Sequence, residues 1–139
     1  MAYDIKITED RGGFSGVLDT DDAFGSAATA IGDLDGNGVT DLVVGAVGDD
    51  DGSADKGALW VLFLDTDSSV KSFQKISALE GGFGTPPGAS GLGSAVANLG
   101  DLDGDGVTDL AAGMPFGSAG PVTGSGTVWI LFLNADGSV

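Results

Sequence analysis

A segment of this 139-residue chain recurs once, 68 residues later, and this internal repeat constrains the fold more than any other feature. Residues 24–42 read FGSAATAIGDLDGNGVTDL, and residues 92–110 read LGSAVANLGDLDGDGVTDL. The apolar run LWVLFL at 59–64 returns as VWILFL at 128–133, displaced by 69 because the loop before it differs in length by one residue. The chain therefore holds two copies of one unit, repeat 1 at about 1–70 and repeat 2 at about 71–139.

Each repeat is expected to form four short strands, because short apolar runs alternate with clusters of Gly, Pro, Asp and Ser. The expected strands of the first blade are Ser26–Ile31, Asp41–Ala46, Ala58–Leu64 and Lys71–Ser77. Their counterparts are Ser94–Leu99, Asp109–Gly113, Thr127–Leu133 and, for the fourth strand, Tyr3–Thr8 at the N-terminus. No stretch has a sustained 3.6-residue apolar period, so the sequence predicts an all-β protein without helices.

Four strands per repeat, one of them built from small residues, indicate β-propeller blades. We expect residues 1–139 to form one propeller fragment of two four-stranded antiparallel blades, the second cut after its third strand. A blade is apolar on both faces, and about four or more blades are needed to close a ring. The chain is therefore expected either to sit inside a larger propeller or to assemble with copies of itself. In the second case three or four chains complete the ring head to tail, with Tyr3–Thr8 of one copy pairing with Thr127–Leu133 of the next.

Each repeat also carries a nine-residue loop with oxygen-bearing side chains at positions 1, 3, 5 and 9 and a valine at position 7 that offers its backbone carbonyl. Calcium takes six to eight oxygen ligands, and glycines at positions 4 and 6 allow such a loop to bend around one ion. The sequence predicts two calcium ions per chain. The predicted ligands are Asp33, Asp35, Asn37, Val39 and Asp41 in repeat 1, and Asp101, Asp103, Asp105, Val107 and Asp109 in repeat 2.

Other interpretations of these loops fit less well. An EF-hand needs a bidentate Glu at position 12, where this chain has Val44 and Ala112. Magnesium prefers fewer protein ligands and stricter geometry than calcium. Asp-Gly and Asn-Gly also make plain hairpin turns, but two copies at one place in a repeat favour metal binding. Because the second loop has four carboxylates and the first has three, we expect the second loop to bind calcium more tightly.

Composition excludes several classes of function. The net charge is −16, with 21 acidic and 5 basic residues, which disfavours nucleic acids and anionic membranes as partners. The chain has no Cys and no His, so it lacks disulfides, thiolate zinc sites and Ser-His or Cys-His nucleophiles. Its longest apolar runs are far shorter than the roughly 20 residues that cross a bilayer, so no membrane insertion is expected. The sequence predicts a binding or structural module and not an enzyme.

Three motifs carry a family resemblance. Phe24-Gly25, the aspartate loop and Val44-Gly45-Ala46 together resemble the FG-GAP repeat of integrin α-subunits and their bacterial relatives. Repeat 2 departs from that pattern at Leu92 and at 112–115. The resemblance implies a propeller of the integrin α-subunit type, with structural calcium sites between the first two strands of a blade. It also implies an extracellular or cell-surface protein, whose export signal is expected to lie outside this chain.

The expected function is a calcium-binding propeller module that acts as an extracellular scaffold or adhesion surface for a protein or glycan ligand. The alternatives are a carbohydrate-binding, lectin-like propeller and an excised or designed fragment without separate activity. Trp60 and Trp129 recur at one repeat position and are interpreted as core or blade-interface residues, not as sugar-stacking platforms. The acidic run at 49–51 has no counterpart in repeat 2 and is interpreted as a solvated loop, with a weak cation site as the alternative.

Overall fold

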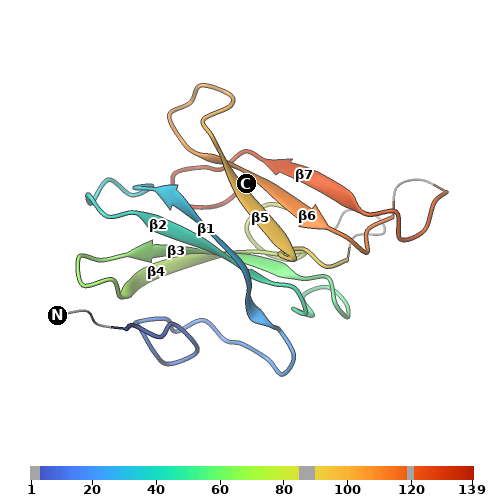
Figure 1. Cartoon of the computed structure of the whole chain (residues 1–139), viewed down its shortest axis with the longest axis horizontal. Coiled ribbons are helices and arrows are strands. Elements are labelled where there is room, and N and C mark those ends of the chain that lie inside the picture. The colour runs from blue at the N-terminus through green and yellow to red at the C-terminus, as the bar shows by residue number, and fades with distance from the viewer. Residues whose placement is uncertain (1–3, 85–89, 119–120) are drawn as a thin grey trace.

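The computed structural model describes residues 4–84, 90–118 and 121–139, and within these ranges the chain contains strands and no helix, so none of them forms a helix that could cross a membrane (Figure 1). The strands form two antiparallel sheets, which we call blade 1 and blade 2. Blade 1 has the order β1 (Phe24–Gly32), β2 (Asp41–Ala46), β3 (Ala58–Leu64) and β4 (Val70–Ile76). Blade 2 has the order β5 (Ala95–Gly100), β6 (Asp109–Met114) and β7 (Thr127–Leu131).

The predicted strands agree closely with the observed ones, except at the N-terminus. β2 and β3 have the predicted bounds, and the other five strands differ from theirs by one or two residues at one or both ends. The prediction of a strand at Tyr3–Thr8 is wrong for the described residues 4–8, of which only Thr8 forms a bridge, to Arg11. A strand needs a neighbouring strand to satisfy its backbone groups, and no strand of the described residues pairs with this segment. Tyr3 lies outside the described residues.

The two blades stack face to face and share one apolar core, as neighbouring propeller blades do (Figure 1). β5 lies beside β1, and the Asn98 side-chain amide donates a 2.8 Å hydrogen bond to the carbonyl of Ala30. Blade 1 contributes to this core Ile31, Val43, Leu59, Val61, Phe63 and Ile76, and the second repeat contributes Leu92, Leu110, Ala112, Met114, Leu131 and Leu133. These side chains alternate along the strands, so each sheet presents one of its faces to the other.

The other face of blade 1 is covered by the segment that precedes β1. Phe14 is 1% exposed, packs edge-to-face on Trp60 with ring centroids 5.2 Å apart, and stacks on Phe24. The second repeat has the same arrangement, with Phe83 edge-to-face on Trp129 at 5.6 Å. Residues 4–23 therefore lie against blade 1 much as residues 77–84 lie against blade 2.

A charged cluster ties β4 to the loop after β2. The Lys75 ammonium bonds the carboxylates of Asp49 at 2.7 Å and Asp51 at 2.8 Å, and it lies 5.1 Å from the ring centroid of Trp60. Burial alone lowers the pKa of Lys75, but its hydrogen bonds to the two carboxylates outweigh burial and raise the pKa above its ordinary value. The interpretation of residues 49–51 as a solvated loop is therefore wrong for Asp49, which is 2% exposed and paired.

We expect the Lys75→Met substitution to destabilise the fold. Methionine keeps the apolar stem over Trp60 but leaves the buried carboxylate of Asp49 without its cation, which costs about 3 kcal/mol of unfolding free energy. Urea denaturation in the presence of chelator measures this cost. Lys71→Met is the matched control and should cause a much smaller change, because the Lys71 ion pair faces water. Equal losses of unfolding free energy in the two variants would show that the buried ion pair stabilises the fold no more than the exposed one.

Candidate metal centre

The two aspartate loops join the first two strands of each blade. Residues 33–40 connect β1 to β2, and residues 101–108 connect β5 to β6. The glycines at positions 4 and 6 adopt positive φ angles in both loops: 77° and 86° for Gly36 and Gly38, and 83° and 90° for Gly104 and Gly106. A side chain would be strained at these angles, so the glycines let each loop curl over its own aspartates.

Three predicted ligands converge in each loop. One carboxylate oxygen from each of Asp33, Asp35 and Asp41 lies within 4.8 Å of the others, and Asp101, Asp103 and Asp109 form the same arrangement. Calcium–oxygen distances are about 2.3–2.6 Å, so ligands on opposite sides of one ion lie about 5 Å apart. All six groups are hard oxygen donors, and the chain has no Cys or His that would favour a softer metal. The donor set and its spacing therefore fit a calcium ion.

The last aspartate of each loop is fixed by the sheet. Asp41 is fully buried, and its two oxygens accept hydrogen bonds from the backbone N–H groups of Leu34 at 2.8 Å and Leu64 at 2.9 Å. Asp109 is held in the same way by Leu102 and Leu133. A carboxylate has about four acceptor positions, so two such bonds leave capacity for a cation. The loop and the end of the third strand are thereby linked through one side chain.

The first aspartate of each loop accepts backbone N–H groups of the same loop. Asp33 accepts from Asn37 at 2.9 Å and Gly38 at 2.7 Å, and Asp101 accepts from Gly104, Asp105 and Gly106. The bond from Gly38 is the largest of several that lower the pKa of Asp33 below its ordinary value. This carboxylate is therefore ionised at neutral pH, as a metal ligand must be.

Position 5 differs between the loops. Asn37 uses its side-chain oxygen to accept from the N–H of Val39 at 2.7 Å and its NH₂ group to donate to the carbonyl of Leu64 at 2.7 Å. Asp105 accepts from the N–H of Val107 in the same way but has no group that could donate to the third strand. Neither residue belongs to the converging groups of three. The ligand roles of positions 5 and 7 stay predictions.

A lysine that sequence reasoning missed lies at loop 1. The Lys71 ammonium, on β4, forms an ion pair with Asp35, and this hydrogen bond raises the Lys71 pKa above its ordinary value. Among the described residues, no ion pair involves a carboxylate of loop 2. Loop 1 thus has three carboxylates and a basic partner, whereas loop 2 has four carboxylates and no such partner.

The tryptophans offer little for sugar binding. Trp60 is 3% exposed, with Phe14, Phe73 and Lys75 packed around its ring, so the prediction that it is a core residue is confirmed. Trp129 is 38% exposed but lies against Phe83. A stacking platform for a sugar needs an open aromatic face, and this arrangement does not favour the lectin alternative.

Comparison with known proteins identifies the repeats. The FG-GAP repeat matches residues 24–62 and 92–131, which together make up more than half of the chain and contain both loops. Integrin alpha pat-2 of Caenorhabditis briggsae is 40% identical over 91 residues, or 65% of this chain. The chain spans only 7% of the length of that relative. The family predicted from Phe24-Gly25 and the aspartate loops is confirmed, and the chain belongs to the FG-GAP repeat family.

Proposed function

We propose that this chain is a calcium-stabilised, integrin-like β-propeller module that serves as a structural scaffold or binding surface outside the cell. The observation that carries the proposal is the convergence of three carboxylates at the same place in both blades. Its relatives support it as well, because the chain shares the FG-GAP repeat and is similar to an integrin α-subunit. The proposed role is non-catalytic, consistent with the lack of His and Cys nucleophile systems.

Electrostatics explains why a cation is needed. Two carboxylates about 4 Å apart repel by about 1 kcal/mol in water and about 4 kcal/mol at an effective dielectric constant of 20. Backbone N–H groups offset part of this repulsion in both loops, and Lys71 offsets more in loop 1. A calcium ion would remove the remainder and hold the first two strands of each blade together. Partly exposed sites of this kind suit the dissociation constants of about 10⁻⁴–10⁻³ M that extracellular modules have.

The first test is calcium titration by calorimetry, together with thermal unfolding. Wild-type protein should bind two ions per chain, and calcium at 100 times its dissociation constant should stabilise the fold by about 2.7 kcal/mol per site. Asp35→Asn and Asp103→Asn should each weaken one site about tenfold or more, because each removes one exposed carboxylate. Asp10→Asn is the matched control, since Asp10 is exposed, has a φ of 60° that Asn tolerates, and lies in neither loop. Unchanged stability in millimolar calcium and chelator would refute the proposal.

The second test compares the two loops. Loop 2 should bind calcium more tightly than loop 1, because its predicted ligand set carries four carboxylates and no ion pair with a lysine among the described residues neutralises it. Lys71→Met should raise the affinity of loop 1 a few-fold and leave loop 2 unchanged, since the variant frees Asp35 from its ion pair. Titrating this variant in the Asp103→Asn background isolates loop 1. A weaker loop 1 in the variant would indicate that Lys71 positions Asp35 for the metal and does not compete with it.

A further inference from the structure

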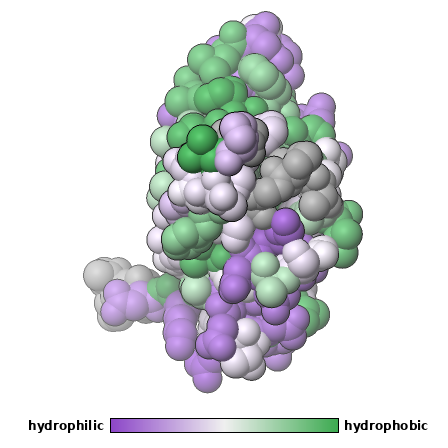
Figure 2. Space-filling view, turned by 90° about the vertical axis from the view of Figure 1, so that its right-hand side faces the viewer, coloured by the Kyte–Doolittle hydropathy of each residue, from purple (hydrophilic) through white to green (hydrophobic). Residues whose placement is uncertain are grey.

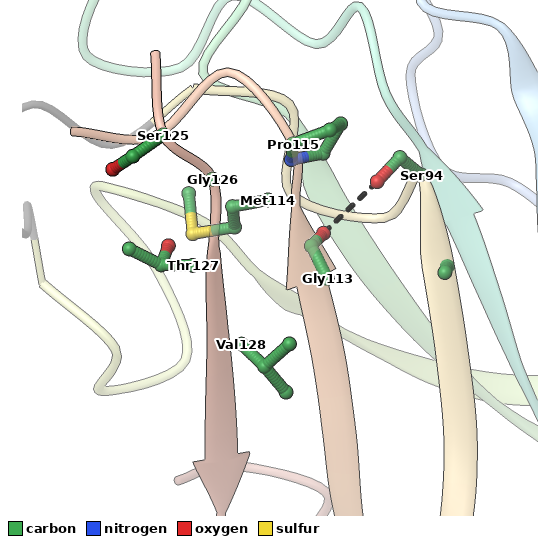
Figure 3. A pocket seen from close by; sticks show the side chains of 9 residues that line it. Ser94, Gly113, Met114, Pro115, Ser125, Gly126, Thr127 and Val128 are labelled. Atoms are coloured by element: carbon green, nitrogen blue, oxygen red, sulfur yellow. Dashed lines mark hydrogen bonds between the residues drawn. The ribbon is translucent and has the colours of Figure 1, made fainter. Parts of the chain in front are cut away.

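A cavity of about 450 Å³ opens on blade 2, between the start of β5, the end of β6 and the start of β7 (Figure 3). Its lining is small and mostly apolar, and the Ser94 hydroxyl donates a 3.0 Å hydrogen bond across it to the carbonyl of Gly113. The Thr127 hydroxyl on its wall is buried and has no hydrogen-bond partner within the described residues.

The same place on blade 1 is filled by the second repeat. Gly45 and Gly57 are the repeat counterparts of Gly113 and Gly126, and a Cβ atom on either would overlap the backbone carbonyl of Gly93 or Leu92, respectively. The Ser26 hydroxyl donates to the carbonyl of Gly93 at 2.9 Å. On blade 1, the surface around Gly45 and Gly57, which we call the seat, holds the segment that leads into blade 2. The cavity is the equivalent seat on blade 2, around Gly113 and Gly126.

The seat on blade 2 is open. A Cβ atom on Gly113 or Gly126 would come no closer than 3.4 Å to any neighbour, and those neighbours belong to blade 2 itself. An apolar face continues from the seat along β7: Val128 is 71% exposed, Ile130 45% and Phe132 48%. Their counterparts Leu59, Val61 and Phe63 are 0–6% exposed because blade 2 covers them. Figure 2 shows hydrophobic residues gathered on the upper part of the molecule, which blade 2 forms in Figure 1.

The chain also carries the segment that fits such a seat. Ala23, Phe24 and Gly25 are the counterparts of Gly91, Leu92 and Gly93. Gly25 and Gly93 share a left-handed backbone, with φ angles of 96° and 89°. Gly91 and Gly93 are buried in the seat on blade 1, whereas Ala23 and Gly25 are exposed, and a Cβ atom on Gly25 would meet nothing within 4 Å. Both halves of the contact are thus present and uncovered on one chain.

We propose that the open face of blade 2 docks blade 1 of a second copy of this chain, head to tail, with Ala23–Gly25 of that copy seated beside Gly113 and Gly126. The inference extends the proposed propeller architecture and does not depend on calcium. A heterologous contact of this kind repeats from copy to copy until the rotation closes a ring. Three or four copies would give six or eight blades.

The same docking explains the segment that forms no strand. On blade 1, β4, which lies at the start of repeat 2, pairs with β3 of repeat 1. Residues 4–8 are the repeat counterpart of β4, so those of the docked copy would lie along β7. Among the described residues β7 pairs only with β6, and its other edge is free. The covering segment that includes Phe14 is no obstacle, because its counterpart around Phe83 lies on blade 2 while blade 2 is packed against blade 1.

Sedimentation velocity in about 0.15 M salt, which screens the repulsion between chains of charge −16, tests the docking with two variants. Gly113→Val fills the seat, and Ala23→Lys places a charge on the segment that enters it. Wild-type protein should sediment as a multiple of its 13.6 kDa mass, and each variant alone should be monomeric or associate at least tenfold more weakly. An equimolar mixture should form a heterodimer, because one variant keeps the segment and the other keeps the seat.

Leu79→Lys is the control, since Leu79 is 69% exposed and lies outside both halves of the contact, so this variant should assemble like the wild type. Ile130→Lys is a second variant of the blade 2 face if Gly113→Val unfolds. A monomeric wild type, assembly of the variants at wild-type strength, or a mixture that does not pair would each overturn the proposal. Calcium titration of monomeric Ala23→Lys separates the two proposals: loss of calcium binding with intact wild-type assembly would refute the calcium function and leave the docking standing.

Discussion

A sheet that is apolar on both faces must bury both, and this constraint governs the whole molecule. Blade 1 meets it within the chain, because blade 2 covers one face and the Phe14 segment covers the other. Blade 2 meets it on one face, where Met114 and Leu131 are 1–2% exposed, and leaves Ile130 and Phe132 of the other face in water. The asymmetry between the two similar repeats follows from their different neighbours.

The loops depend on a second constraint, the repulsion between gathered carboxylates. Asp41 and Asp109 link the carboxylate loops to the buried sheets. Each is buried at the start of a strand, and each accepts hydrogen bonds both from the loop and from the end of the third strand. In repeat 1, the acidic loop lies at one end of β1 and the Ala23–Gly25 segment lies at the other end. An ion that fixes the loop would also restrain the strand that carries this segment.

The sequence was sufficient for what depends on local pattern. Seven strands and the convergence of three carboxylates in each loop follow from runs such as Ala58–Leu64 and from the spacing of Asp33 and Asp41. The sequence was insufficient where a residue distant along the chain determines whether a segment forms a strand or a side chain is buried. Residues 4–8 have the pattern of β4 but no strand beside them, and Asp49 resembles a loop acid but is buried against Lys75. Aligning Gly45 with Gly113 could have indicated the seat, because a glycine kept inside a strand often marks a close backbone approach.

The position of the basic residues separates the two loops in any assembly. Lys71 and Lys75 both lie on β4, and blade 2 has no counterpart of this strand among the described residues. If a docked copy supplied such a strand, its repeat counterpart of Lys75 would be Lys6, whereas the counterpart of Lys71 in the sequence is the uncharged Ala2. Loop 2 would then still have four carboxylates and no lysine beside them. We therefore expect a bound cation to contribute more at Asp101–Asp109 than at Asp33–Asp41, with or without a ring.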